Sequence, residues 1–145
     1  MIRLVSQGRM MRENIVRSNE DECRLIHECL QDYNREYMDN GKDYSFHIEF
    51  DGVIAAGIVA ESVEDTLEIS YLFVRSEYRG RGLGTKLVCH IESLAKENGI
   101  RRIFLNTYSF QAPDFYRHLG YREILCIDPV FGVHSQHYFV KELNC

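Results

Sequence analysis

The pattern of hydrophobic and polar residues along the chain predicts three helices separated by strands. Apolar residues recur three and four positions apart over residues 23–37 and again over residues 83–95, as they do on one face of an amphipathic helix. Ser18 and Asp21 form a capping box ahead of the first of these helices, and Pro113 begins a short third helix. Alternating or continuous apolar runs predict strands over residues 44–50, 53–60, 67–74, 102–107, 121–127 and 137–143, with a short additional strand near Ile15.

The order of these elements predicts an α+β fold with a mixed, mostly antiparallel sheet. The strands before residue 75 are joined by short turns such as Asp51-Gly52, so we expect them to run antiparallel. Helices then alternate with strands, and the last two strands flank a predicted loop over residues 128–136. No linker, repeat or low-complexity segment interrupts the 145 residues, so we expect a single domain over residues 1–145.

Composition and charge argue against several classes of protein. The net charge is −5 and no basic run extends beyond Arg101-Arg102, which argues against a nucleic-acid partner. No apolar run approaches the roughly 18 residues of a membrane span, and Met1 to Arg12 lack the apolar centre of a signal peptide, so we expect a cytoplasmic protein. The five cysteines have no close ligand spacing and His134 and His137 have no third ligand nearby in sequence, so no metal site is predicted.

The most specific chemistry lies in the glycine-rich segment between the strand over 67–74 and the helix over 83–95. Its three glycines can adopt positive φ, which lets backbone N–H groups converge on an anion beside the positive end of the helix dipole. Its two arginines can add charge-assisted hydrogen bonds, so a diphosphate is the expected ligand. These residues are Arg79, Gly80, Arg81, Gly82 and Gly84.

Two other kinds of glycine-rich loop do not fit this segment. The loop of phosphate-binding NTPases would require Gly-Lys-Ser/Thr, whereas the chain has Gly84-Thr85-Lys86, and the dinucleotide fingerprint would require a third glycine near Leu87. The pattern Arg-x-x-Gly-x-Gly instead resembles the coenzyme A diphosphate loop of the GNAT superfamily of acyl-CoA-dependent N-acyltransferases. This resemblance implies the mixed GNAT sheet, with helices on both faces and the fourth and fifth strands splayed apart.

A second segment resembles another signature of the same family, Ala-x-x-x-Tyr-x-x-x-Gly-Phe/Tyr. The matching residues are Ala112, Tyr116, Gly120 and Tyr121. In the family this tyrosine gives a proton to the departing thiolate, so the resemblance assigns that role to Tyr116. The alternative is that Tyr116 only positions the sulfur by a hydrogen bond, and that the proton comes from the ammonium group formed by the attack. The family often has an asparagine where this chain has Ser109, and the resemblance points to Ser109 and Gln111 as contacts of the pantetheine arm.

The resemblance implies acetyl-CoA as co-substrate and no metal. We expect the pantetheine arm to pair with the backbone of Leu72, Phe73 and Val74, where an N–H group near Phe73 or Val74 would polarise the thioester carbonyl. The expected contacts of the diphosphate are Arg79, Gly80, Arg81, Gly82, Leu83, Gly84 and Thr85.

The resemblance also implies direct transfer of the acetyl group to a primary amine in a ternary complex. An amine with a pKa near 10.4 costs about 4.6 kcal/mol to deprotonate at pH 7, so a base must assist. Glu68 occupies the position of the general base in histone-modifying relatives, and it is expected to share its strand face with Ser70, Leu72 and Val74. Glu49 and the carboxylates of residues 61–65 are weaker alternatives.

The acceptor amine is expected between residues 33–44 and the predicted loop 128–136. Acidic and tyrosine side chains in the first region suit a small-molecule or peptide amine with a cationic or aromatic portion. The resemblance allows a homodimer formed through the last strands. A non-catalytic acyl-CoA sensor, which would keep the loop and lose the transfer chemistry, is the alternative function.

Overall fold

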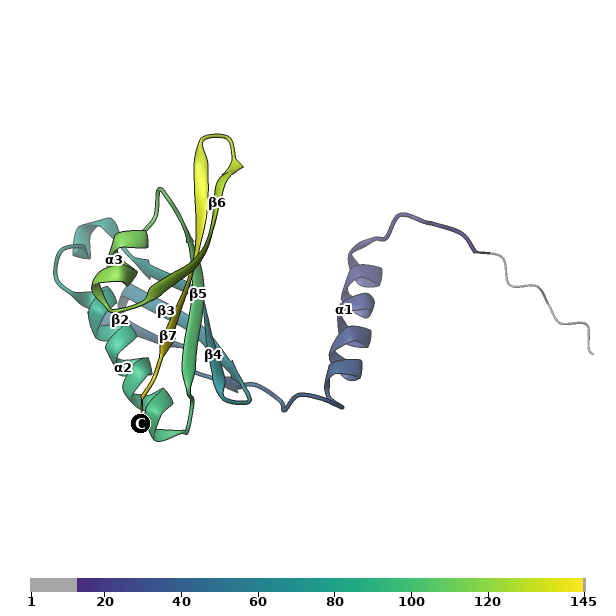
Figure 1. Cartoon of the computed structure of the whole chain (residues 1–145), viewed down its shortest axis with the longest axis horizontal. Helices are drawn as coiled ribbons and strands as arrows, with labels where there is room; N and C mark the ends of the chain where they lie inside the picture. The colour runs from purple at the N-terminus through teal and green to yellow at the C-terminus, as the bar shows by residue number, and fades with distance from the viewer. Residues whose placement is uncertain (1–12, 145) are drawn as a thin grey trace, which may run out of the picture. The chain divides into compact units, whose positions relative to one another are not determined.

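The computed structural model describes residues 13–144. The segment Met1–Arg12, in which no signal peptide is predicted, and Cys145 lie outside the described residues. The chain divides into two compact units, with the boundary between Tyr37 and Met38. The second unit contains all the strands of the described chain (Figure 1). No helix among residues 13–144 is long and apolar enough to span a bilayer.

The described part of the first unit, residues 13–37, contains one helix, α1 (Glu20–Asn34). Its capping box lies one residue later than the sequence predicts: Asn19 accepts a hydrogen bond from the Glu22 N–H at 2.9 Å, and the Glu22 carboxylate accepts one from the Asn19 N–H at 2.8 Å. The predicted pairing of Ser18 with Asp21 is therefore wrong. The predicted strand near Ile15 is also wrong, because residues 13–19 form no regular element.

The second unit is built on a seven-stranded mixed sheet with the order β1-β3-β4-β5-β7-β6, in which β2 also pairs with β3. The pairing of β4 with β5 is parallel and the other pairings are antiparallel. The predicted fold class and the predicted Asp51-Gly52 turn are confirmed; both turn residues have positive φ, 49° and 77°. The strands are β1 (Lys42–Asp43), β2 (Phe46–Phe50), β3 (Val53–Val63), β4 (Thr66–Val74), β5 (Arg102–Tyr108), β6 (Arg122–Phe131) and β7 (His134–Glu142).

The last hairpin differs from the prediction. Residues 128–136 were expected to form a loop, but β6 continues to Phe131 and β7 already begins at His134, so only the turn around Gly132 separates them. Pro129 lies within β6. Because β6 is an edge strand, a proline there need not remove a ladder hydrogen bond, and the strand continues through it.

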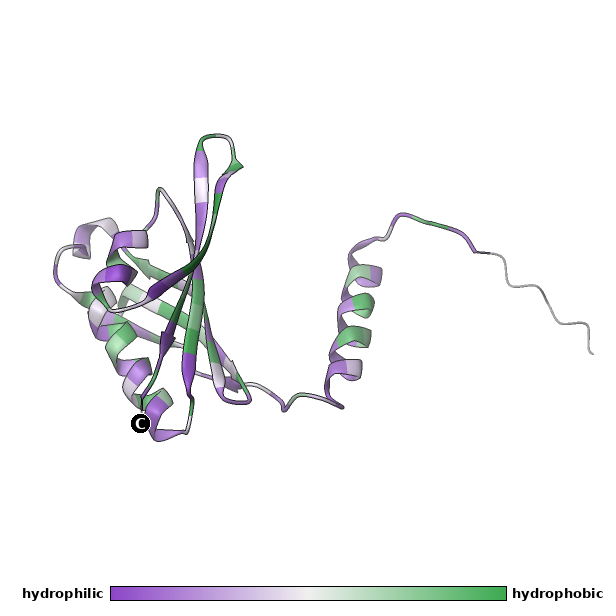
Figure 2. Cartoon of the chain, viewed as in Figure 1, coloured by the Kyte–Doolittle hydropathy of each residue, from purple (hydrophilic) through white to green (hydrophobic). Residues whose placement is uncertain are grey.

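Within the second unit two helices, α2 (Leu83–Glu97) and α3 (Pro113–His118), pack on the same face of the sheet (Figure 1). The helices on both faces that the resemblance implies are therefore not found within the described part of this unit. The apolar stripe of α2 is buried as predicted, and it closes a core with buried residues of the central strands. Figure 2 shows this stripe as the hydrophobic side of the helix. Asn98 and Gly99 end α2 as the sequence predicts, with Gly99 at φ 77°. Core residues shared by helix and sheet include Leu87, Val88, Ile91, Leu67, Leu105 and Phe139.

The two central strands separate part-way along their length. The pairing of β4 with β5 runs from Thr66 opposite Arg102 to Ile69 opposite Leu105 and then stops, although β4 continues to Val74 and β5 to Tyr108. The predicted splay between the fourth and fifth strands is therefore confirmed. It opens the sheet on the side where α2 begins.

Candidate active site

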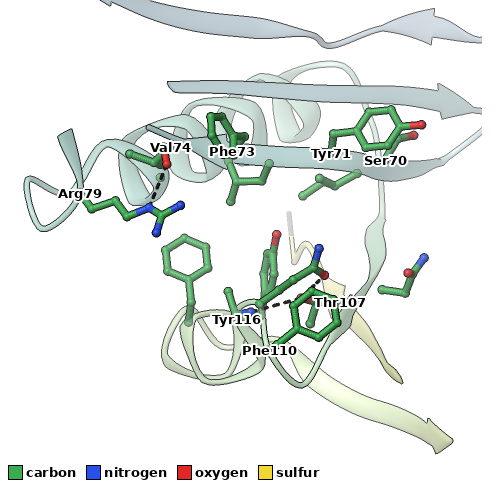
Figure 3. A pocket seen from close by; sticks show the side chains of 15 residues that line it. Ser70, Tyr71, Phe73, Val74, Arg79, Thr107, Phe110 and Tyr116 are labelled. Carbon is green, nitrogen blue, oxygen red and sulfur yellow. Dashed lines mark hydrogen bonds between the residues drawn. The ribbon is translucent and has the colours of Figure 1, made fainter. Parts of the chain in front are cut away.

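A cavity of about 690 Å³ lies where β4 and β5 diverge. One wall is β4 and the opposite wall is β5 with the segment leading into α3, while α2 closes one end (Figure 3). Its lining consists of Ile69, Ser70, Tyr71, Leu72, Phe73 and Val74 from β4, Arg79 and Gly84 from the loop and α2, and Asn106, Thr107, Phe110, Gln111, Ala112, Phe115 and Tyr116 from the opposite side.

A β-bulge at Ser70 determines which side chains of β4 face the helices. Tyr71 lies opposite Val59 and Ile69 lies opposite Ala60, so Ser70 has no partner of its own on β3. The bulge reverses the alternation of side chains, and Leu72 therefore packs on the core side together with Ile69.

The same bulge corrects the expected position of Glu68. Glu68 lies opposite Glu61 and shares the outer face with Tyr71 and Phe73, not with Leu72 and Val74 as predicted. It is exposed and precedes the first lining residue of β4 by one position, so it does not itself line the cavity.

Beyond Ile69, the main-chain groups of β4 that face β5 are available to a ligand. Each strand residue carries an N–H and a C=O, and on the side of β5 these groups have no strand partner once the pairing ends. Such an edge can pair with an extended chain that enters the gap. The cavity therefore offers strand-like hydrogen bonding along residues 70–74.

The loop before α2 has the backbone that the sequence predicts for an anion site. Gly80 and Gly82 have φ of 76° and 73°, and Gly82 is the N-cap of α2. A Cβ atom at either position would meet nothing within 4 Å, so glycine is needed there for the backbone conformation and not for space.

The N-terminus of α2 presents its N–H groups without competition from the protein's own side chains. Among the described residues no side chain caps it, and its first turn contains no acidic residue. By contrast, α1 has both a side-chain cap and three acidic residues in its first turn. Uncapped N–H groups and the helix dipole together favour an anionic ligand at α2.

The two arginines of the loop have different positions. Arg79 donates a hydrogen bond from Nε to the carbonyl oxygen of Val74 at 3.0 Å, which holds its guanidinium at the edge of the cavity (Figure 3). Arg81 lies over the ring of Tyr78, with its Cζ 5.4 Å from the ring centre, and does not line the cavity.

Gly84 allows α2 to approach α3. A Cβ atom on Gly84 would lie 3.4 Å from Cζ of Phe115 and 3.7 Å from Cγ2 of Val74. A larger side chain at this position would therefore push into the cavity wall. Phe115 precedes Tyr116, so the contact also helps to place the tyrosine.

Tyr116 is the buried phenol of the site. Its side chain is 5% exposed, and it packs against the rings of Phe115, Tyr121 and Phe139 with centre-to-centre distances of 5.1, 5.6 and 6.1 Å. Burial raises the pKa of Tyr116 to about 12, because the phenolate would lose its hydration. Tyr116 is therefore a neutral hydrogen-bond donor throughout the physiological range.

The segment between β5 and α3 is held by side chains that the sequence suggested as cofactor contacts. Gln111 Oε1 accepts hydrogen bonds from the Tyr108 N–H at 2.8 Å and the Thr107 hydroxyl at 3.2 Å, so its side chain shapes the wall. Ser109 Oγ accepts a hydrogen bond from the Ser135 N–H at 3.1 Å, and Ser109 does not line the cavity.

The structure thus brings together about half of the residues that the sequence analysis proposes. Leu72, Phe73, Val74, Arg79, Gly84, Gln111 and Tyr116 line one cavity. Gly80, Arg81, Gly82 and Thr85 belong to the adjoining loop and first turn of α2, and the side chain of Leu83 is buried in the core. Glu68 and Ser109 lie outside the lining.

Several lining residues were not among the proposed site residues. Ser70 and Tyr71 line the cavity and lie at the bulge, which leaves no pattern in the sequence. Phe110 lies two residues before the second signature and Phe115 lies within it, and these two aromatic residues were a usable signal. The other missed residues are Ile69, Asn106, Thr107 and Ala112.

Comparison with known proteins agrees with this geometry. Residues 12–121 match the family model described as the acetyltransferase (GNAT) family. A blasticidin-S acetyltransferase from Streptomyces morookaense is 36% identical over 93 residues, which are 63% of this chain and 68% of that protein. The crystal structure of an acetyltransferase from Bacillus cereus has a TM-score of 0.81 at 32% identity and covers 90% of this chain and 98% of its own.

A more distant structure shares the fold and contains the co-substrate. A protein from Bacillus anthracis, described as a candidate streptothricin acetyltransferase, was solved in complex with acetyl coenzyme A. Its TM-score is 0.62 at 20% identity, with 74% of this chain and 66% of that chain covered. Acetyltransferases of the GNAT family use acetyl-CoA. The two sequence signatures, the splayed sheet and these matches lead to one conclusion: the chain belongs to the GNAT family and is an acetyltransferase.

Proposed function

We propose that the enzyme transfers the acetyl group of acetyl-CoA directly to a primary amine of a small molecule within a ternary complex. The observation that carries this proposal is the uncapped N-terminus of α2, which adjoins a cavity between two strands with unpaired main-chain groups. A diphosphate suits the first feature and an extended pantetheine arm suits the second.

The proposed contacts of acetyl-CoA follow from this arrangement. The diphosphate would accept hydrogen bonds from N–H groups over residues 80–85 and from Arg79, whose guanidinium is already oriented by Val74. The pantetheine arm would run along Leu72–Val74, where an N–H group near Phe73 or Val74 can stabilise the oxyanion that forms on the thioester carbonyl.

Tyr116 acts in this proposal as a hydrogen-bond donor to the departing sulfur. Full proton transfer from a phenol with a pKa of about 12 to a thiolate with a pKa near 8.5 would cost about 5 kcal/mol. A hydrogen bond stabilises the developing negative charge without that cost. The proton that finally neutralises the thiolate then comes from the ammonium group formed by the attack.

Glu68 is the proposed base on the amine side. Its carboxylate is exposed on the outer face of β4, one residue before the cavity, so it would accept the proton through a water molecule and not by direct contact. Glu61 lies opposite Glu68 on β3 and has the same charge on the same face, which makes it a matched comparison.

The acceptor is proposed to be an amine attached to a planar or cationic group. Phe110 lines the cavity and contacts a cluster of rings: its centre is 5.5 Å from Tyr108, 6.3 Å from Phe131 and 4.8 Å from His134. Rings of this kind bind planar groups by stacking and cations through their faces. The blasticidin-S acetyltransferase among the relatives supports a small-molecule acceptor in place of a peptide.

The remaining features of the proposal rest on the sequence. We infer that residues 1–145 work as one acetyltransferase domain, since the family match crosses the boundary between the two units. The four described cysteines are free, in keeping with a cytoplasmic location. Nucleic acid is not a proposed partner, and a homodimer formed through β6 and β7 stays a prediction. A non-catalytic acyl-CoA sensor would bind acetyl-CoA and release no thiol with any amine.

The first prediction concerns Tyr116→Phe. We expect kcat to fall at least about tenfold while the Kd of acetyl-CoA stays nearly unchanged, because the hydrogen bond to sulfur matters only as the thiolate leaves. The measurement is thiol release from acetyl-CoA across a panel of amines. Since the pKa of Tyr116 is about 12, the phenol stays protonated up to pH 10. Deprotonation of Tyr116 should therefore cause no loss of the wild-type rate up to that pH.

Tyr121→Phe is the matched control for this experiment. Tyr121 is also a buried tyrosine of the same aromatic cluster, but it does not line the cavity and its hydroxyl has no hydrogen-bond partner among the described residues. Its replacement should leave the rate within about twofold of wild type. Equal rates for wild type and Tyr116→Phe would remove the assigned role.

The second prediction concerns Glu68→Gln. At pH 7 we expect kcat/KM to fall about tenfold, and this deficit should shrink as the pH approaches 10, because a growing fraction of the amine is then neutral without help. Glu61→Gln should have little effect at either pH. A deficit that is independent of pH, or one shared by both variants, would show that Glu68 is not the base.

The third prediction concerns Phe110→Ala. For an amine that carries a heteroaromatic ring we expect KM to rise about tenfold, in line with the roughly 1–3 kcal/mol lost when a stacking ring is removed. For a linear aliphatic amine KM should change little. Phe46→Ala, on the distant strand β2, is the control. Equal changes for both amines would contradict stacking.

A further inference from the structure

Glu123, Cys126 and His137 form a cluster of three metal-ligating groups outside the cavity. Their ligand atoms all lie within 4.8 Å of one another. The cluster lies on the hairpin of β6 and β7 that forms one edge of the sheet (Figure 1). The spacing of the cysteines in the sequence predicts no metal site, but the fold brings these three residues together in a way that spacing does not reveal.

A β-bulge explains why the spacing of these residues in the sequence does not predict the cluster. Residues three positions apart on a regular strand point to opposite faces, so Glu123 and Cys126 would be separated by the sheet. Glu123 lies opposite Phe139, but Leu125 lies opposite Tyr138, so β6 has one extra residue between them. Because Cys126 then lies opposite His137, all three side chains occupy the same face.

The three donors are close to the arrangement that a tetrahedral metal requires. His137 Nδ1 lies 2.8 Å from Glu123 Oε1, and Cys126 is exposed and free to turn its sulfur toward them. Zinc lies about 2.0–2.3 Å from nitrogen, oxygen and sulfur ligands, so its ligands are roughly 3.5 Å apart. Small side-chain rotations therefore suffice to admit an ion between them.

An outer shell that would orient these ligands is already present. Ser135 Oγ lies 2.8 Å from His137 Nε2, which leaves Nδ1 as the ring nitrogen on the side of Glu123. Arg117 donates a hydrogen bond to Glu123 Oε2 at 2.6 Å and leaves Oε1 for an ion. Asp114 lies 2.6 Å from the same guanidinium and offsets its positive charge. Metal sites commonly have such partners behind each ligand.

The same contacts could be interpreted as a Ser-His-Glu chain that activates Ser135 as a nucleophile. Ser135 is only 9% exposed and does not line the cavity, so no substrate there can reach it. Its N–H and carbonyl groups are also paired with Ser109. The exposed sulfur of Cys126 has no role in such a chain and is accounted for by a metal site.

We propose that Glu123, Cys126 and His137 bind one zinc ion, with a water molecule as fourth ligand. A set of one sulfur, one nitrogen and one carboxylate oxygen selects zinc over the hard cations calcium and magnesium, which prefer oxygen. The thiolate and the carboxylate together balance the charge of the ion. The site would link β6 to β7 beside Arg117, which directly follows Tyr116 in α3. It does not depend on the acetyl-transfer proposal.

The experiment is a titration of the metal-free, full-length protein with Co²⁺, followed by competition with Zn²⁺. We expect one ion per chain, the strong visible bands of tetrahedral cobalt, and a thiolate-to-cobalt charge-transfer band that Zn²⁺ removes. Cys126→Ser should abolish the charge-transfer band, and Cys89→Ser, which changes another exposed cysteine, should keep it. Ser135→Ala should retain the band and weaken binding about 10–100-fold.

Thermal unfolding gives a second measurement that does not rely on spectroscopy. Zinc should raise the Tm of wild type and of Cys89→Ser, and it should not raise that of Cys126→Ser, because an ion that binds only the folded state stabilises it. A charge-transfer band that survives in Cys126→Ser, or wild-type affinity no higher than that of Cys126→Ser, would overturn the proposal.

Discussion

The site is determined by the point at which β4 and β5 stop pairing. Their ladder ends after Ile69 on β4 and Leu105 on β5. Up to that point the two strands share a parallel ladder, and beyond it their main-chain groups on the facing sides need other partners. The separation creates the cavity, exposes an edge of β4 inside the protein, and directs the chain after Val74 into the loop that begins α2. One change in strand pairing thus provides the proposed sites for both the pantetheine arm and the diphosphate.

Burial of Tyr116 determines the chemistry available at the other side of the cavity. The rings that surround it raise its pKa to about 12, which makes it a dependable donor and a poor acid. The same packing joins α3 to the sheet through Phe139, so the position of the phenol and the stability of this region depend on one cluster. This favours a mechanism in which Tyr116 stabilises charge and the acceptor amine supplies the proton.

Much of this account could be predicted from the sequence, because glycines and short motifs fix local backbone geometry. The positive φ of Gly82 at the start of α2 and the turn at Asp51-Gly52 are local properties, and both are confirmed. The burial of Tyr116 depends on rings from other elements and was not predicted. The bulge at Ser70 and the extra residue between Glu123 and Leu125 depend on pairing with distant strands. They reversed the predicted face of Glu68 and concealed the cluster with His137. The continuation of β6 through Pro129 was not predicted either, because the sequence does not reveal that β6 is an edge strand.

The most direct test of the central claim is calorimetric binding of acetyl-CoA and of acetylated pantetheine, which lacks the diphosphate. The account predicts that acetyl-CoA binds at least about tenfold more tightly, since charge-assisted hydrogen bonds contribute roughly 1.5–3 kcal/mol each. Gly82→Val, which strains the loop at φ 73°, should remove most of that advantage and leave the fragment's affinity unchanged. Equal affinity for the two ligands, or an advantage that survives Gly82→Val, would contradict diphosphate binding at the start of α2.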